Sequence, residues 1–97
     1  MIEKISMLQF IDSHCHINFS AFAGQMPHLQ QEMRLHQVSH ALVVSVNLPD
    51  FPSVLACAES RDNLFASVGV HPDYEDEIEP TVAQLCDLAQ HEKIVAI

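Results

Sequence analysis

Two histidines, His14 and His16, stand two positions apart after a short apolar run, and Asp12 precedes His14 by two. Alternate residues of a strand point to the same side, so the two imidazoles and the carboxylate are expected to face one way and Cys15 the other. Adjacent imidazoles can ligate one divalent metal ion, and Asp12 could bind that ion or orient a ligand. The pattern predicts either a metal site or a polar, solvated strand end.

A third histidine, His71, follows another apolar run in the segment VGVHP. Pro72 disfavours helical dihedral angles at His71 and so places it in a loop directly after the predicted strand. There the side chain could contact a phosphate group or assist a metal-bound water, although an ordinary loop histidine remains the alternative. Histidines at the ends of two strands of one sheet are a stronger signal than either motif alone.

Other polar residues have simpler explanations. Ser45, Asn47 and Asp50 lie near the end of a further apolar run and could reach the same rim, but Asp50 is more simply a helix cap. Residues 73–79 carry five carboxylates, which fit a solvated loop before a helix better than a metal-binding loop. The remaining histidines are expected to be structural: His28, His36, His40 and His91.

Apolar runs and helical patterns alternate along the chain. Strands are predicted at 7–12, 41–46, 64–70 and 93–97, and amphipathic helices at 27–37, 51–60 and 80–91. Strands separated by helices form parallel βαβ units with right-handed crossovers. The fold class is therefore α/β, as a doubly wound sheet or part of a (β/α)8 barrel. Both architectures place functional residues at the carboxyl ends of the strands.

Composition narrows the function classes. The chain has 97 residues and a net charge of −9, which fits one globular domain and disfavours a direct electrostatic grip on nucleic acid. A bound cation could supply the missing positive charge. No apolar run approaches the roughly 20 residues of a membrane span. The three cysteines form no C-x-x-C pair, so we expect free thiols, a reducing compartment and a cytoplasmic protein.

Three segments together resemble the amino-terminal part of TatD-type metal-dependent deoxyribonucleases, which are related to the amidohydrolases. These segments are FIDSHCHI at 10–17, VGVHP at 68–72 and KIVAI at 93–97. The resemblance implies a TIM barrel that uses two divalent metal ions to hydrolyse phosphodiesters such as DNA. Mg²⁺ would support activity, and Zn²⁺ or Mn²⁺ could also occupy the site. In such a site His14 and His16 would bind metal, Asp12 would support a ligand and His71 would bind a substrate phosphate.

In that family, the segment matching 93–97 continues into a G-E-T-G-L-D motif that carries a metal-bridging glutamate. We therefore expect residues 1–97 to be the N-terminal portion of a single barrel domain that typically needs about 250 residues. The main acid and base residues would lie beyond it. Such a fragment would be inactive alone and prone to self-association. Two alternatives stay open: a non-catalytic truncated remnant, and a related metallohydrolase acting on a small substrate.

Overall fold

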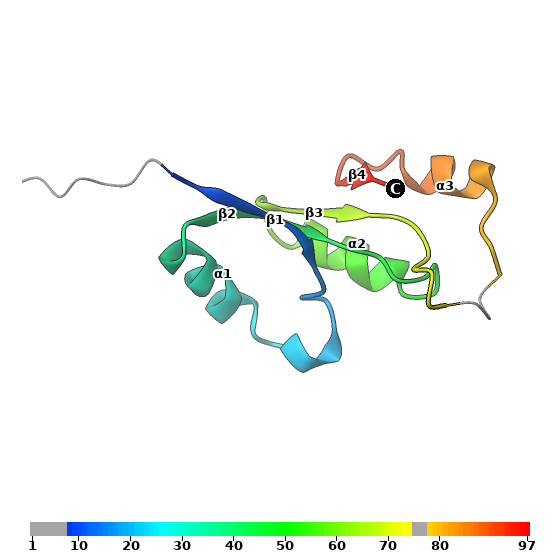
Figure 1. The fold of residues 1–97 in the computed structure, drawn as a ribbon. Coiled ribbons are helices and arrows are strands. Elements are labelled where there is room, and N and C mark those ends of the chain that lie inside the picture. The colour runs from blue at the N-terminus through cyan, green and yellow to red at the C-terminus, as the bar shows by residue number, and fades with distance from the viewer. Residues whose placement is uncertain (1–7, 75–77) are drawn as a thin grey trace, which may run out of the picture.

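The computed structural model describes residues 8–74 and 78–97. In this part of the chain, four parallel strands form one sheet in the order β1-β2-β3-β4, and helices connect them (Figure 1). The strands are β1 (Phe10–Cys15), β2 (Val38–Val43), β3 (Leu64–Ser67) and β4 (Ile94–Ala96). The helices are a short 3-10 turn, η1 (Ser20–Phe22), then α1 (Met26–Leu35), α2 (Phe51–Glu59) and α3 (Val82–Leu88). The predicted α/β alternation and the partial barrel architecture are confirmed.

The strand boundaries differ from the predicted ones because pairing with a neighbour, and not apolarity, sets them. The first strand continues to Cys15, where β1 still pairs with β2; Met7, the predicted start, lies outside the described residues. β2 begins at Val38 instead of residue 41 and ends before Val44. Its regular ladder with β3 stops there because the Ser45 N–H bonds to the Ser67 hydroxyl.

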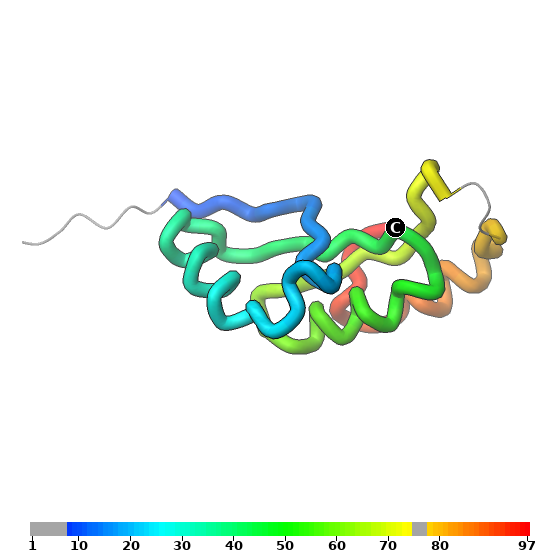
Figure 2. The backbone as a smooth tube through the Cα atoms, turned by 90° about the horizontal axis from the view of Figure 1, so that it is seen from below, coloured from blue at the N-terminus to red at the C-terminus, as the bar shows by residue number. Residues whose placement is uncertain are grey.

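One face of the sheet carries the hydrophobic core. Val43, Ala66 and Val68 from the sheet region pack with Val54 and Ala58 of α2, and all five are buried. Figure 2 shows α1 and α2 running along the same side of the strands. The α2 residues recur at the i, i+4 spacing that the sequence showed, because one stripe of the helix must meet the sheet. This packing fixes the strands whose carboxyl ends carry the predicted site.

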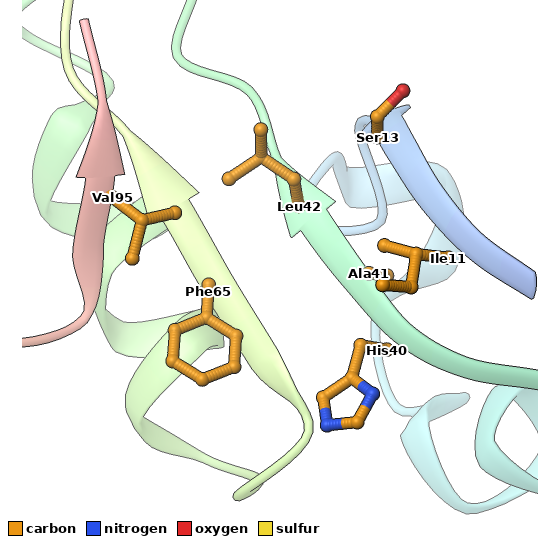
Figure 3. Close-up of a pocket in the computed structure, with 7 residues that line it drawn as sticks. All are labelled: Ile11, Ser13, His40, Ala41, Leu42, Phe65 and Val95. Atoms are coloured by element: carbon orange, nitrogen blue, oxygen red, sulfur yellow. The ribbon is translucent and has the colours of Figure 1, made fainter.

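The other face of the sheet is apolar and open. Ile11, Leu42, Phe65 and Val95 project from four successive strands and line a cavity of about 360 Å³ (Figure 3). His40 lies on this face too, beside Phe65, with the ring centroids 6.3 Å apart. In a closed barrel this face would form the filled interior. Among the described residues, no helix is both long and apolar enough to cross a membrane.

Candidate metal-binding site

The rings of His14 and His16 lie against each other at the carboxyl end of β1. Their centroids are 5.1 Å apart and their planes meet at 83°, an edge-to-face arrangement. His14 is exposed and His16 is half-buried. The sequence prediction that these two imidazoles come together is confirmed, and the pair offers two nitrogen donors within reach of one small cation.

Contacts within the protein fix the ring of His16. Its Nδ1 lies 3.1 Å from the carbonyl oxygen of Val44, just beyond the end of β2. A carbonyl oxygen only accepts hydrogen bonds, so Nδ1 carries the proton and the Nε2 lone pair of the neutral ring is available to a metal. The ring of Phe19 stacks on His16 at 4.8 Å and 18°. Metal-binding histidines typically donate their other ring N–H to a carbonyl or carboxylate in this way.

Asp12 does not share the side of the sheet on which His14 lies, so that expectation is wrong. Asp12 pairs with Ala41 and Cys15 pairs with Val43, so three steps along β1 oppose two along β2. This bulge absorbs one residue and reverses the alternation that the prediction assumed. Asp12 lines a cavity with α1 residues, and its Oδ1 accepts a hydrogen bond from the His14 backbone N–H at 3.0 Å. Its support of a metal ligand stays a prediction.

Cys15 points toward the helices, as predicted, and packs against the core. Its Sγ lies 3.3 Å from the carbonyl oxygen of Leu42. Burial raises the pKa of the Cys15 thiol to about 11, and the charge of Asp12 adds to the rise. This thiol is therefore neutral near pH 7 and behaves as a packing group.

His71 and His14 line one cavity of about 310 Å³ at the ends of the strands. The His71 backbone N–H donates to the carbonyl of Val46 at 2.8 Å, which ties the loop after β3 to the loop after β2. The His71 Nδ1 accepts the Asp73 backbone N–H at 3.1 Å. In its neutral form the ring therefore carries its proton on Nε2. The predicted role of His71 in phosphate binding requires a donor such as this Nε2–H, which could bond to a phosphate oxygen.

The polar residues after β2 serve the loop as well as the rim. Ser45 is buried and lines the strand-end cavity, as the sequence allowed. Asp50 occupies the N-cap position of α2, but its side chain makes no capping hydrogen bond. Its carboxylate instead accepts a bond from the Asn18 amide at 3.2 Å, while Asn47 Oδ1 accepts the Asp50 N–H at 2.7 Å. The predicted N-cap position of Asp50 is therefore confirmed, but its carboxylate contacts Asn18 and not a backbone N–H of α2.

The remaining predicted features lie away from this cavity. His28 and His36 flank Glu32 on α1 at 3.9 and 3.5 Å, and His91 lies 3.4 Å from Glu59. Within the acidic segment, residues 75–77 lie outside the described residues. The contacts of His28, His36 and His91 with glutamates agree with the structural roles predicted from the sequence.

Sequence reasoning missed Asn18, Phe19 and Ser67. Asn18 Nδ2 also donates to Ser53 Oγ at 3.1 Å, so Asn18 links the loop after β1 to α2. A signal existed for Ser67, because it lies two residues after Phe65 and so shares the inner face. Phe19 follows His16 by three in a tight turn, and such a turn cannot be recognised without its backbone geometry.

The two histidines could form only part of a metal-ligand set. Within residues 8–74 and 78–97, no three His, Cys, Asp or Glu side chains gather closely enough to hold a metal ion by themselves. The donors present nevertheless fit a divalent cation: two imidazoles in contact, one with its free nitrogen defined by the bond to Val44. A complete centre would add ligands to this pair.

Comparison with known proteins agrees with this site. The sequence profile of the family described as TatD related DNase matches residues 11–97. The uncharacterized metal-dependent hydrolase YabD of Bacillus subtilis is 29% identical over 87 residues, which cover 89% of this chain and 34% of that protein. YjjV of Escherichia coli, also called an uncharacterized metal-dependent hydrolase, is 36% identical over 64 residues, 66% of this chain and 25% of that protein.

The crystal structure of YjjV, described as a TatD homolog from Escherichia coli K12, superimposes with a TM-score of 0.72 and 32% identity. The match covers 90% of this chain and 35% of the YjjV chain. The chain thus spans about a third of the length of the relatives it matches most broadly. The family profile covers nearly all of this chain, and the fold agrees with a solved TatD homolog, so the chain belongs to the TatD family.

Proposed function

We propose that this chain contributes the first metal ligands and a phosphate contact to a divalent-metal-dependent hydrolase that cleaves phosphodiester bonds in DNA. The observation that carries the proposal is the orientation of His16 by Val44 and Phe19. His16 lies beside His14, which lines a cavity together with His71. The names of the relatives support metal-dependent hydrolysis, and the family description supports DNA. The whole protein would be the active unit.

His14 and His16 would hold one metal ion of a two-metal centre through their ring nitrogens. When bound, a divalent ion supplies a nucleophilic hydroxide and stabilises charge on the phosphoryl oxygens. Mg²⁺ is the expected ion for activity, with Zn²⁺ or Mn²⁺ as other occupants. Bound cations would also reduce the electrostatic repulsion between DNA, a polyanion, and a chain with a net charge of −9.

The strand-end cavity suits an anionic group. His71 would donate its Nε2–H to a phosphoryl oxygen, since its Nδ1 accepts the Asp73 backbone N–H. Among the described residues, no Asp or Glu side chain lines this cavity. The three cysteines, all free thiols, support a cytoplasmic location for the protein.

Hydrolysis assays test the proposal on the polypeptide that the complete reading frame encodes. We expect it to cleave DNA and bis(p-nitrophenyl) phosphate with added Mg²⁺, and to lose both activities with EDTA. The double substitution His14→Ala with His16→Ala should lower both rates about a hundredfold or more, because partners of metal ligands alone typically account for 10- to 100-fold. His40→Ala, on the open face of the sheet, is the matched control.

Full activity in the double variant would refute the assignment of these ligands. Cleavage of small esters without cleavage of DNA would refute the substrate and leave the metal site standing. A protein without hydrolase activity at any metal concentration would refute the enzyme proposal as a whole.

A further inference from the structure

Ser67 closes β3 on the inner face of the sheet, inside the strand-end cavity. It lies two residues after Phe65, which projects onto that face (Figure 3). Only 8% of Ser67 is exposed, and it lines the cavity together with His14 and His71. Its backbone is held by pairing with Ala96 of β4. Its hydroxyl is therefore a buried polar group in a rigid position at the candidate site.

The hydrogen bonds of Ser67 leave one proton unused. Its Oγ accepts the Ser45 backbone N–H at 3.1 Å, and its carbonyl accepts the Ser45 hydroxyl at 2.7 Å. Within the described residues, the Ser67 hydroxyl itself donates no hydrogen bond. Buried donors in folded proteins are almost always satisfied by the protein, by water or by a ligand. The Ser67 hydroxyl is therefore available to donate to a water molecule or a ligand in the cavity.

The chemistry of the cavity selects the class of that partner. The Ser67 hydroxyl and, in its neutral form, the His71 ring each offer a proton. No Asp or Glu side chain among the described residues lines the wall, and the Asp73 carboxylate lies behind the ring, 3.7 Å from His71 Nδ1. Two donors on the cavity wall favour an oxyanion over a cation. We infer that Ser67 is a substrate-binding residue whose hydroxyl donates to a non-bridging oxygen of the phosphodiester, beside His71. The inference rests on the proposed function and adds a contact to the same site.

Titration of the isotope-labelled 97-residue chain with inorganic phosphate and with dimethyl phosphate tests the inference by NMR. Both probes should shift the amide signals of Ser67, Gly69 and His71. Ser67→Ala should raise the Kd of both probes about tenfold, because the lost hydrogen bond has a charged acceptor. Ser67→Thr keeps the hydroxyl and should retain most of the affinity.

Ser60→Ala is the matched control, because it removes a hydroxyl bond to a backbone carbonyl, that of Cys57, outside the strand-end cavity. Urea unfolding should show that both alanine variants lose stability, whereas only Ser67→Ala should lose phosphate affinity. Equal affinity in Ser67→Ala, equal loss in both variants, or no phosphate binding by the unsubstituted chain would each overturn the inference. Binding of inorganic phosphate without dimethyl phosphate would overturn the diester as the ligand.

A separate titration with Zn²⁺ keeps this result apart from the proposed function. It follows the ring signals of His14 and His16. Their failure to respond would count against the metal site, and it would leave the phosphate measurement to decide on Ser67.

Discussion

Phe19 and His16 form one stacked unit in the turn after β1. Their ring centroids are 4.8 Å apart with an interplanar angle of 18°, and the Phe19 backbone N–H donates to the His16 carbonyl at 3.0 Å. The bond from His16 Nδ1 to Val44 restrains the same imidazole from the neighbouring strand. Stacking fixes the plane of the ring and the hydrogen bond fixes its tautomer. Together they determine the direction of the Nε2 atom that we propose as a metal ligand.

Removing the stacked ring should therefore weaken metal binding without touching a ligand. We expect Phe19→Ala to lower the Zn²⁺ affinity of the chain about tenfold, in the range typical of residues that orient a ligand. Calorimetric titration measures the affinity, and NMR line broadening of the His16 ring signals should report the greater freedom of the ring plane. Phe19→Tyr should restore both. Phe22→Ala, in the same turn, should change neither; an equal effect there would mean that general loosening of the loop is the cause.

The alternation of apolar runs predicted the parallel sheet, its helices and the end of the sheet that carries the histidines. Such predictions succeed because hydrophobic burial acts on every strand in the same way. His14 and His71 reached one cavity for this reason: the carboxyl ends of parallel strands meet at one edge. The sequence could also have placed Ser67 there, by counting from Phe65.

The bulge in β1 and the engagement of Asp50 could not be predicted from the sequence. Both depend on which residues of distant segments come opposite each other. Asp12 lies on the α1 side of the sheet because β1 has one more residue than β2 between the pairs Asp12–Ala41 and Cys15–Val43. Asp50 is the N-cap residue of α2, but its carboxylate accepts a bond from Asn18, 32 positions away in the chain, and makes no capping bond. The local sequence pattern contains no information on the bulge or on the contact between Asn18 and Asp50.

Lys93 should be a strong determinant of stability. Its Nζ donates to the carbonyls of Arg61 and Leu64 at 3.0 and 2.9 Å and lies 4.5 Å from the centroid of the Phe65 ring. These bonds join the start of β4 to the start of β3. Lys93→Met keeps much of the side-chain volume and removes the ammonium, so the free energy of unfolding should fall by about 2 kcal/mol.

Urea unfolding measures the loss, and Arg34→Met is its control because it makes the same change in charge at an exposed position on α1. A loss of comparable size in Arg34→Met would show that net charge, and not the carbonyl cluster, sets the effect.

The three thiols should differ in reactivity. Burial raises the pKa of Cys15 to about 11 and also raises that of Cys57, whereas Cys86 is exposed. The thiolate is the reactive form, so at pH 8 in EDTA iodoacetamide should modify Cys86 first and Cys15 last. Raising the pH from 8 to 10 should accelerate the Cys15 reaction steadily, because its thiolate fraction grows about tenfold per pH unit below the pKa. Peptide mass spectrometry measures each rate. Modification of Cys15 as fast as Cys86 would contradict its burial.

The open face of the sheet should make association of this chain depend on salt. Ile11 and Val95 remain 68% and 58% exposed on that face, so burying them against another surface is favourable. The net charge of −9 opposes contact between copies, and this repulsion weakens as the screening length falls to about 8 Å at 0.15 M salt. Sedimentation velocity should therefore show more self-association, and a hydrophobic dye more fluorescence per chain, at high salt than at low salt.

Substituting both Ile11 and Val95 by Gln should suppress association. Leu35 on α1 is 67% exposed but lies outside this face, so Leu35→Gln should leave association unchanged. Association that is insensitive to the Ile11 and Val95 changes would place the contact elsewhere on the molecule.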